Sequence, residues 1–460
     1  MTIMAAMAMC ETVTTAQDQR TQYVSHKVEA PFEMEEIKEY IFPNKTFNIA
    51  RYGAKTGVEE ANVKTNTNAI GKAIKACNKA GGGTVLVPKG EWLTGPIHLM
   101  SNVNLHLDEG ATLVFSDNHL DYLPAVQTSW EGLECMNYSP LIYAFECQNI
   151  AISGKGKIQP RIEGWTEWFK RPQAHLEALK KLYEWGSTDV PVTEREMAEG
   201  ENNLRPHLIH LNRCQNILLE DFSINGSPFW TIHLFLCDGG IARNLNVYAH
   251  NHNNDGIDLE MTRNVLVENC RFDQGDDAIV IKSGRNRDAW RVGQPTENVV
   301  VRNCTVVKGH CLLGIGSEMS GGVRNILMEN CVALDGVLRM MYLKTNHRRG
   351  GFIDHVYMRR CKGTTANRMF EIDTEVLYQW KDLVPTYETR ITDIHHIYME
   401  DCEIESTDAI FEIAGDVRKP VHDVYLRNLR IGKVKEFVNR VVNGLNVVTE
   451  GVVVEEGISE

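Results

Sequence analysis

The sequence lacks both a stretch that could cross a membrane and an excess of positive charge. Nothing in its 460 residues approaches about 18 consecutive apolar residues, the length that a transmembrane helix requires. Lysine and arginine number 48 against 61 aspartates and glutamates, which gives a net charge of −13. Because nucleic acid binding needs a basic surface, this balance excludes nucleic acid as a partner. We expect an acidic, folded protein and a monomer.

The twelve cysteines form none of the motifs that bind metal ions. There is no CxxC pair and no cluster of cysteine and histidine at the spacing of zinc ligands. Five of the cysteines instead end copies of one repeated segment, at 265–270, 299–304, 326–331, 356–361 and 397–402. Two further copies, 217–222 and 424–429, have Phe222 and Leu429 in the same position. Since such a position is buried and apolar, we predict unpaired structural thiols, no metal ion and no cofactor.

The repeat also predicts the fold class. Each copy is a short run of β-branched residues with alternating inward and outward positions, followed by a polar turn, and copies recur every 27 to 41 residues or so. Repeats of this length form stacked units that bury their apolar faces against one another. Short strands with almost no helices between them exclude βαβ units and favour an all-β solenoid. In such a coil, equivalent residues of successive turns lie about 4.8 Å apart along one face.

Two helical segments interrupt the strand pattern. Apolar residues at helical spacing predict a helix over 66–80, which would cover the open end of the solenoid. Its N-cap is expected at Asn66, Thr67 or Asn68, and the glycines at 81–83 end it. A second helix is expected over about 173–185, within an aromatic-rich insertion that spans roughly 160–203. The insertion is either a packed excursion or a wall over a binding groove.

The first 30 residues resemble a leader rather than part of the fold. Residues 1–9 are apolar and 15–17 resemble a cleavage region, but the charged start and longer apolar core of a complete signal peptide are missing. We expect a signal peptide that lacks its start, a lipoprotein acceptor at Cys10 or a disordered tail. On this expectation residues 31–460 form one domain, and the protein is secreted or periplasmic.

Three aspartates in the middle of the chain carry the first indication of chemistry. Asp255 precedes one strand, and Asp276 and Asp277 follow that strand, 21 residues beyond Asp255. One solenoid turn separates them, so stacking brings the three carboxylates together. Crowded carboxylates cannot all ionise at their ordinary pKa values, so one can stay protonated as a general acid while others act as bases. Adjacent residues of a strand point to opposite faces. Asp276 and Asp277 can therefore both reach the site only if they lie at a strand end or a bulge, which Gly275 permits.

Two other interpretations compete with a catalytic one. Taken alone, residues 253–258 (NNDGID) are typical of a turn. The segment also fits the start of a calcium-binding loop, but position twelve of that loop is Thr262 rather than glutamate, which excludes it. The catalytic interpretation is favoured because His310 and then Lys344 follow in successive turns. Carboxylates, an imidazole and an ammonium on one face make an acid–base site that tolerates an anion.

These motifs resemble those of the polygalacturonases of glycoside hydrolase family 28, in particular the bacterial exo-acting branch. The family pattern Asn-Thr-Asp, Gly/Gln-Asp-Asp, Gly-His-Gly and Arg-Ile-Lys is matched in order by residues 253–255 (NND), 275–277 (GDD), 309–311 (GHC) and 342–344 (YLK). The resemblance extends from residues 47–54 (FNIARYGA) through 227–230 (SPFW) to the last repeats. It implies a single-stranded, right-handed parallel β-helix of the pectin-lyase-like type.

The resemblance implies a role for each matched residue. Asp276 would be the general acid, while Asp255 and Asp277 would be the bases that activate water. His310 would tune the acid, and Lys344 would bind a substrate carboxylate. Further substrate-binding candidates are Asn253, Lys282, Arg285, Tyr342, Arg348 and His233.

Two positions depart from the family pattern. Cys311 replaces the second glycine of Gly-His-Gly, a small change that the backbone can tolerate. Tyr342 replaces an arginine, which would hold a carboxylate by two charge-assisted hydrogen bonds, whereas tyrosine offers one neutral hydroxyl. Either the leaving-group subsite holds a neutral sugar, such as the rhamnose of rhamnogalacturonan, or another arginine takes over: Arg339, Arg348 or Arg349. Lys282, Arg285 and Arg291 are either further cationic contacts or solvated surface charge.

We therefore expect an enzyme that hydrolyses α-galacturonosyl linkages in pectin, in homogalacturonan or in rhamnogalacturonan fragments. The resemblance and the pair of bases predict inversion, and an insertion that closes one end of the groove predicts exo action. A pectate lyase on a similar β-helix would need a calcium cluster and an arginine base. A non-catalytic carbohydrate-binding solenoid would need no intact acid–base set. Calcium dependence and a reducing-end assay separate these alternatives.

Overall fold

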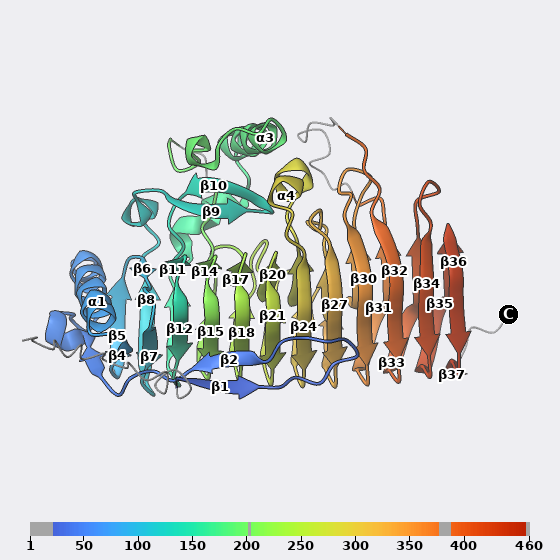
Figure 1. Cartoon of the computed structure of the whole chain (residues 1–460), viewed down its shortest axis with the longest axis horizontal. Helices are drawn as coiled ribbons and strands as arrows, with labels where there is room; N and C mark the ends of the chain where they lie inside the picture. Colours follow the sequence, from blue (N-terminus) through green and yellow to red (C-terminus); the bar gives the residue numbers. More distant parts are fainter. Residues whose placement is uncertain (1–21, 201–203, 377–387, 457–460) are drawn as a thin grey trace, which may run out of the picture.

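The computed structural model describes residues 22–200, 204–376 and 388–456, which form a right-handed parallel β-helix. The strands lie side by side along the long axis of the molecule, with the N-terminal turns at one end and the C-terminal turns at the other (Figure 1). The all-β solenoid predicted from the repeats is thus confirmed. Within the described ranges, no helix combines the length and apolar character needed to cross a bilayer.

One face of the coil is a 13-stranded parallel sheet that contains the repeated segments. Its strands are β3 (Thr46–Asn48), β4 (Gly83–Val87), β7 (Val103–Leu107), β12 (Gln148–Ser153), β15 (Gln215–Glu220), β18 (Asp238–Arg243), β21 (Arg263–Glu268), β24 (Thr296–Arg302), β27 (Val323–Glu329), β30 (Phe352–Arg359), β32 (Asp393–Glu400), β34 (Val421–Arg427) and β36 (Gly444–Glu450).

The other faces form a 20-stranded sheet made of two ladders, each with one strand per turn. The middle ladder contains β5 (Gly90–Thr94), β8 (Ala111–Phe115), β13 (Lys157–Pro160), β16 (Ser223–Asn225), β19 (Asn246–Ala249), β22 (Arg271–Gln274), β25 (Thr305–Gly309) and β28 (Val332–Val337). The third ladder contains β6 (Ile97–His98), β11 (Ile142–Phe145), β14 (Ile209–Asn212), β17 (Ile232–Phe235), β20 (Ile257–Glu260), β23 (Ile279–Lys282), β26 (Leu313–Ile315) and β29 (Arg339–Lys344). The two ladders merge in the C-terminal strands β31 (Lys362–Asp373), β33 (Glu403–Ala414), β35 (Arg430–Val442) and β37 (Val453–Glu456).

The repeated cysteine position lies in the core, as predicted. Its members are buried and make no disulfide: Cys270, Cys304, Cys331, Cys361 and Cys402. Phe222 and Leu429 occupy the same position in two further turns and are buried as well. The residue before the cysteine turns the chain with a positive φ, for example 56° at Asn269 and 55° at Asn303. Asparagine adopts this left-handed conformation more readily than most residues, which explains its recurrence in the repeat.

The capping helix is confirmed but begins earlier than expected. Helix α1 spans Asn62–Lys79, follows η1 (Ile49–Tyr52), and covers the first turn with a buried apolar face. Ala61 is its N-cap and makes no side-chain capping bond, so the expectation of a cap at Asn66, Thr67 or Asn68 was wrong. Asn66 instead lies inside the helix, where its buried amide donates to the carbonyl oxygens of Lys55 and Leu93. It ties the helix to the first turn.

The N-terminal segment contributes to the fold earlier than the expected boundary at residue 30. β1 (Tyr23–His26) pairs with β2 (Ile37–Tyr40) in an antiparallel hairpin. The hairpin and its connection lie across the outer face of the 13-stranded sheet (Figure 1), where Val28 and Ile37 are buried against strands from β12 to β30. The boundary at residue 30 was therefore placed too late. Residues 1–21, which contain most of the expected leader, lie outside the described residues.

The insertion between β13 and β14 packs on the solenoid directly, through Trp165 and Trp168, and also through a hairpin that the sequence did not predict. It contains η3 (Glu163–Trp165), α2 (Thr166–Phe169), α3 (Gln173–Ser187) and η4 (Val192–Glu194). Helix α3 shares an apolar cluster with the hairpin of β9 (Val126–Trp130) and β10 (Leu133–Asn137), which follows η2 (His119–Tyr122). Trp130 of this hairpin stacks on Phe229 of the solenoid, with ring centroids 4.9 Å apart. Together with α4 (Asn286–Val292), these elements stand on one side of the coil (Figure 1) and are called the wall below.

Candidate active site

The predicted acid–base residues lie in loops of consecutive turns that join the middle ladder to the third ladder. Asp255 precedes β20, Asp276 and Asp277 connect β22 to β23, and His310 connects β25 to β26. The register aligns Ile257 with Ile279 on neighbouring strands, so the loops before these strands stack. The stacking predicted from the spacing of the motifs is therefore present.

Two glycines let these loops approach each other closely. A Cβ on Gly275 would lie 2.6 Å from the carbonyl oxygen of Asn251, and one on Gly256 would lie 2.4 Å from that of Ala278. Any larger residue would push the turns apart. Asp276 and Asp277 lie between β22 and β23 rather than within a strand, which releases them from strict alternation and lets both reach the site.

Each of the adjacent aspartates has its own cationic or hydrogen-bonding partners. The Asp276 carboxylate lies 2.9 Å from Nδ1 of His310, and its side chain is 21% exposed. Asp277 is almost fully buried, and Lys344 donates from Nζ to its Oδ2 at 2.6 Å. The Cys311 thiol donates to Oδ1 of Asp277 at 3.0 Å. Cys311 is therefore more than a tolerated replacement for glycine, because it adds a second donor to this carboxylate.

The surroundings separate the pKa values of the two buried aspartates. Burial alone would raise the pKa of Asp277, but the ammonium groups of Lys344 and Lys282 outweigh it and lower this pKa to about 2. Burial raises the pKa of Asp255 to about 7 despite the opposing attraction of Lys282. At pH 6, Asp277 is thus ionised while Asp255 is mostly protonated. A hydrogen bond to Asp276 raises the pKa of His310, which favours its charged form.

The cations that follow the aspartate pair point at protein carboxylates rather than at solvent. Lys282 is buried, and its Nζ lies 3.2 Å from Asp255 and 3.5 Å from Glu318. Arg285 is buried and pairs with Glu318 at 2.7 Å and Glu131 at 3.1 Å. Both residues therefore position the catalytic turns and the wall, and neither is solvated surface charge. Arg291, which pairs with Glu134 and Asp288, lies at the more exposed edge of the same wall.

Tyr342 lies beside Lys344 on β29, as the motif alignment predicted. The Arg339 guanidinium stacks over its ring at 4.5 Å and also pairs with Glu371. Arg349 is buried and donates to the Ser317 carbonyl oxygen, so it cannot replace the family arginine at this surface.

Two other candidates, Arg348 and Asn253, make hydrogen bonds in the loops that contain them. Arg348 lies in the turn after β29, where its backbone N–H donates to the side chain of Asn346. Asn253 has a φ of 57° and accepts a hydrogen bond from the buried Arg205. Asn253 thus holds the Asp255 loop in place.

The expectation that His233 binds substrate was wrong for this conformation. Its side chain is fully buried, with Nε2 2.9 Å from Glu260. Burial also lowers its pKa well below the ordinary value, so the ring is neutral. His233 occupies an outward position of the third ladder, next to Asp258 on β20, but Trp230 and Phe235 cover it.

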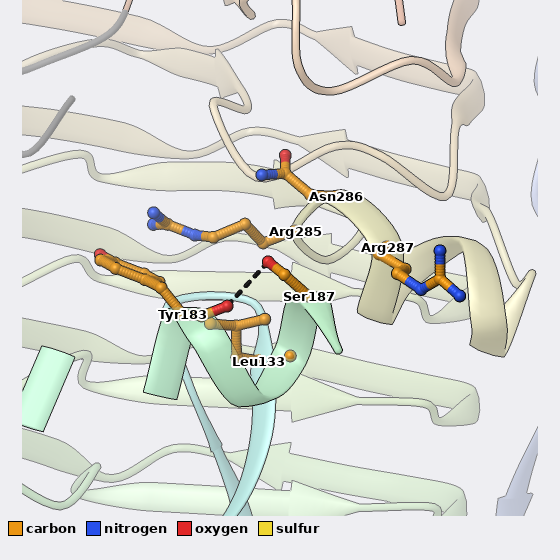
Figure 2. Close-up of a pocket in the computed structure, with 7 residues that line it drawn as sticks. Leu133, Tyr183, Ser187, Arg285, Asn286 and Arg287 are labelled. Carbon is orange, nitrogen blue, oxygen red and sulfur yellow. Dashed lines mark hydrogen bonds between the residues drawn. The ribbon is translucent and has the colours of Figure 1, made fainter. Parts of the chain in front are cut away.

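Sequence reasoning missed the residues with which the wall reaches the site. Figure 2 shows the contact between α3 and α4, where Tyr183 and Ser187 face Arg285 and its neighbours. The Arg285 guanidinium lies 4.8 Å from the Tyr183 ring centroid. Arg171, from the insertion, hydrogen-bonds to His252 in the Asp255 loop and lies close enough to Asp276 to feel its charge. No local pattern marks Tyr183, Ser187 or Arg171, because the place of each depends on how the insertion packs.

The comparisons with known proteins agree with the motif alignment. The family model described as "Glycosyl hydrolases family 28" matches residues 193–442. A hyperthermoactive exopolygalacturonase from Thermotoga maritima has 34% sequence identity and a TM-score of 0.83, over 91% of this chain and 93% of that one. A family 28 exopolygalacturonase from Yersinia enterocolitica, at 19% identity and a TM-score of 0.63, covers 91% of this chain and 79% of its own; this likeness shows the fold alone.

Curated relatives match over a shorter range. An exo-poly-alpha-D-galacturonosidase from Dickeya chrysanthemi is 28% identical over 315 residues, which is 63% of this chain and 50% of that protein. A probable polygalacturonase from Vitis vinifera is 27% identical over 306 residues, 64% of this chain and 56% of its own. The match thus spans about half the length of these two relatives.

Proposed function

Because the chain belongs to glycosyl hydrolases family 28, we propose that it hydrolyses α-galacturonosyl linkages in pectin, from the chain end and with inversion. The observation that carries this proposal is the stack of Asp255, Asp276, Asp277 and His310 in consecutive turns, with Lys344 beside them. Both the Thermotoga maritima and Dickeya chrysanthemi relatives are exo-acting by name.

Each aspartate has a proposed role that its surroundings support. Asp276, the most exposed of the three, donates a proton to the leaving oxygen, with His310 oriented on its carboxylate. Asp277 is kept ionised by Lys344 and accepts a proton from the attacking water. Asp255 shares the water and acts as a second base once it has lost its proton. A water held between acid and base attacks from the face opposite the leaving group, which inverts the anomeric carbon.

Exo action rests on the wall. Apolar packing of α3 on the β9–β10 hairpin and the Arg285–Glu318 ion pair hold the wall against the catalytic turns. Arg171 brings a guanidinium from the insertion to the edge of the Asp276 loop. A wall that stands at one end of the groove leaves room for a terminal sugar only, and Arg171 is the cation placed to bind that sugar's carboxylate.

The polymeric substrate also suggests a cellular location. A pectic polymer is too large to cross a membrane, so we propose that the enzyme acts in the periplasm or outside the cell. We propose that it acts as a monomer, because the site is built from residues of one chain.

Product analysis on homogalacturonan and rhamnogalacturonan side by side tests this function. At low conversion we expect galacturonic acid as the sole product, with polymer viscosity falling slowly. Proton NMR of the first product should show the β-anomer, since the α-linked substrate is inverted. A ladder of mixed oligomers would reject exo action, an initial α-anomer would reject inversion, and no release of reducing ends would reject the hydrolase.

Replacing Arg171 with glutamine should weaken binding of the terminal sugar. We expect KM on oligogalacturonates to rise by about 10- to 100-fold with kcat little changed, because a hydrogen bond to a charged group contributes roughly 1.5–3 kcal/mol. Lys170→Gln is the matched control, because Lys170 is exposed and pairs with Glu167, which is exposed as well. Equal KM values for the two variants would show that Arg171 does not bind the terminal sugar.

Replacing Tyr342 with arginine tests the identity of the leaving sugar. If that subsite holds a neutral sugar, the added guanidinium should shift the preference toward homogalacturonan by about tenfold or more, as one charge-assisted contact would. The ratio of kcat/KM on homogalacturonan to that on rhamnogalacturonan is the measurement, and Tyr342→Phe controls for loss of the hydroxyl. An unchanged ratio would mean that Tyr342 does not face the leaving sugar.

A further inference from the structure

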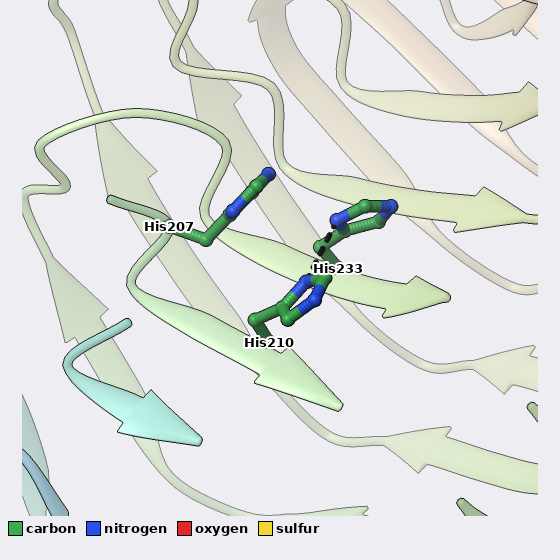
Figure 3. A group of neighbouring side chains, drawn as sticks. All are labelled: His207, His210 and His233. Atoms are coloured by element: carbon green, nitrogen blue, oxygen red, sulfur yellow. Dashed lines mark hydrogen bonds between the residues drawn. The ribbon is translucent and has the colours of Figure 1, made fainter. Parts of the chain in front are cut away.

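Three histidines form a buried cluster beneath the wall. His207 lies just before β14, His210 lies on β14, and His233 lies on β17, one turn further along the coil. Their side chains are at most 1% exposed. Figure 3 shows the three rings gathered around a common point, with a hydrogen bond between His210 and His233. The proposed catalytic steps use none of them.

The spacing of the rings fits three ligands of one small ion. Ring centroids are 4.7 Å apart for His207 and His233, and 4.8 Å apart for the other two pairs. One nitrogen from each ring lies within 4.8 Å of the others, and the Nδ1 atoms of His210 and His233 are 3.0 Å apart. Imidazoles bound to one tetrahedral ion at about 2.0–2.1 Å place their centroids roughly 5 Å apart.

The hydrogen bonds of the cluster are incomplete without a further partner. Nε2 of His207 and Nε2 of His210 are buried and have no hydrogen-bond partner among the described residues. Buried polar atoms are nearly always paired in folded proteins, so each exception calls for an explanation. Burial keeps all three rings neutral by lowering their pKa values, and the neutral imidazole is the form that binds a metal ion.

His233 is held by a carboxylate in the way that metal-bound histidines are. Its Nε2 lies 2.9 Å from Oε2 of Glu260, and Oε1 of Glu260 accepts from the backbone N–H of Gly284 at 3.0 Å. This fixes the ring so that Nδ1 is left to face His210. Metal-ligating histidines characteristically place the far nitrogen on a carboxylate in this manner.

We propose that His207, His210 and His233 bind a divalent transition metal ion of the zinc or nickel class. The all-nitrogen donor set favours such an ion over calcium or magnesium, which prefer oxygen ligands. The ion ties the segment before β14 to two successive turns, under Phe229 and Trp230, on which the wall rests. It is a structural ion, since the cluster is closed to solvent and its side chains take no part in the proposed catalytic steps.

Metal content of the full-length protein tests the proposal independently of hydrolytic activity. The chain, without an affinity tag, is unfolded with a chelator and refolded with or without Zn²⁺, because a buried site fills during folding. We expect one Zn²⁺ per chain to remain after desalting and to raise the unfolding temperature. Refolding with Co²⁺ should give the visible absorption of a tetrahedral nitrogen site. His210→Gln should lose the ion, the temperature shift and the Co²⁺ spectrum together.

The chain supplies its own control for adventitious binding. Asp354, His395 and His396 form a partly exposed cluster with comparable donor spacing on the opposite sheet. The double variant His395→Gln and His396→Gln should retain the ion. If that variant loses it, or if wild type refolds to the same unfolding temperature with no bound Zn²⁺, the histidines form only a hydrogen-bonded core cluster. Should His210→Gln fail to refold, His207→Gln, which lies outside the strands, gives the same comparison.

Discussion

Replacing Asp276 with asparagine is expected to lower kcat by about 10²–10⁴-fold, the usual contribution of a general acid. Asparagine keeps the size of the side chain and still accepts a hydrogen bond from Nδ1 of His310, so the loop should keep its shape. It cannot donate a proton to the leaving oxygen. The measurement is kcat on oligogalacturonates, with circular dichroism and the unfolding temperature showing that the fold is intact.

Asp255→Asn is the informative comparison, because burial gives Asp255 the raised pKa that a proton donor would need. Asp255 is nearly inaccessible beside Lys282, which argues against a direct role as the acid. A substrate with a good leaving group, such as an aryl galacturonide, needs little acid assistance and should rescue the variant that lacks the acid. If this substrate rescues Asp255→Asn and not Asp276→Asn, then Asp255 is the general acid and Asp276 is a base.

The second large effect is expected on the acid side of the pH profile. If Asp255 must be ionised to act as a base, kcat/KM should fall about tenfold for each pH unit below about 7, since this parameter reports the free enzyme. The sign follows from the raised pKa, because the proton that Asp255 takes up below pH 7 removes its basic form. Asp277, with a pKa of about 2, stays ionised throughout this range.

The acid limb should disappear in Asp255→Asn, which would then retain a low but pH-independent kcat/KM between pH 4 and 7 or so. The corresponding Asp277→Asn variant should keep the limb but lose most of its rate at every pH. A wild-type profile that stays level from pH 7 to pH 5 would show that Asp277 is the sole base. In that case the water need not be shared with Asp255.

Much of the fold could be predicted because the solenoid repeats its local rules. From β15 to β34, each turn places a cysteine, leucine or phenylalanine in the same buried position, after a residue with positive φ that is usually asparagine or aspartate. Motif spacing then placed Asp255, Asp276 and His310 in consecutive turns, since one turn of the coil separates neighbouring loops. Both features follow from the local sequence, so they could be predicted without knowledge of tertiary contacts.

What could not be predicted depends on contacts between distant segments. Lys282 and Arg285 fit either substrate contacts or surface charge in the sequence, and only the positions of Glu318 and Glu131 decide between these. The burial of His233 depends on Trp230 and on the wall above it. The wall itself contains the β9–β10 hairpin, whose short strands lie before the repeats become regular. Its place on the solenoid follows from the stacking of Trp130 on Phe229.

The segment that contains β1 and β2 changes how the coil would come apart. In a simple solenoid each turn contacts only its neighbours, so stability is a sum of nearest-neighbour terms and the ends can fray one unit at a time. Here one stretch near the N-terminus, with Val28, Phe32 and Ile37, packs across outer strands from β12 to β30. This segment therefore couples the unfolding of turns that do not contact one another directly. The central turns that contain the three aspartates should thus unfold as one cooperative unit. The turns beyond β32 should be able to unfold separately.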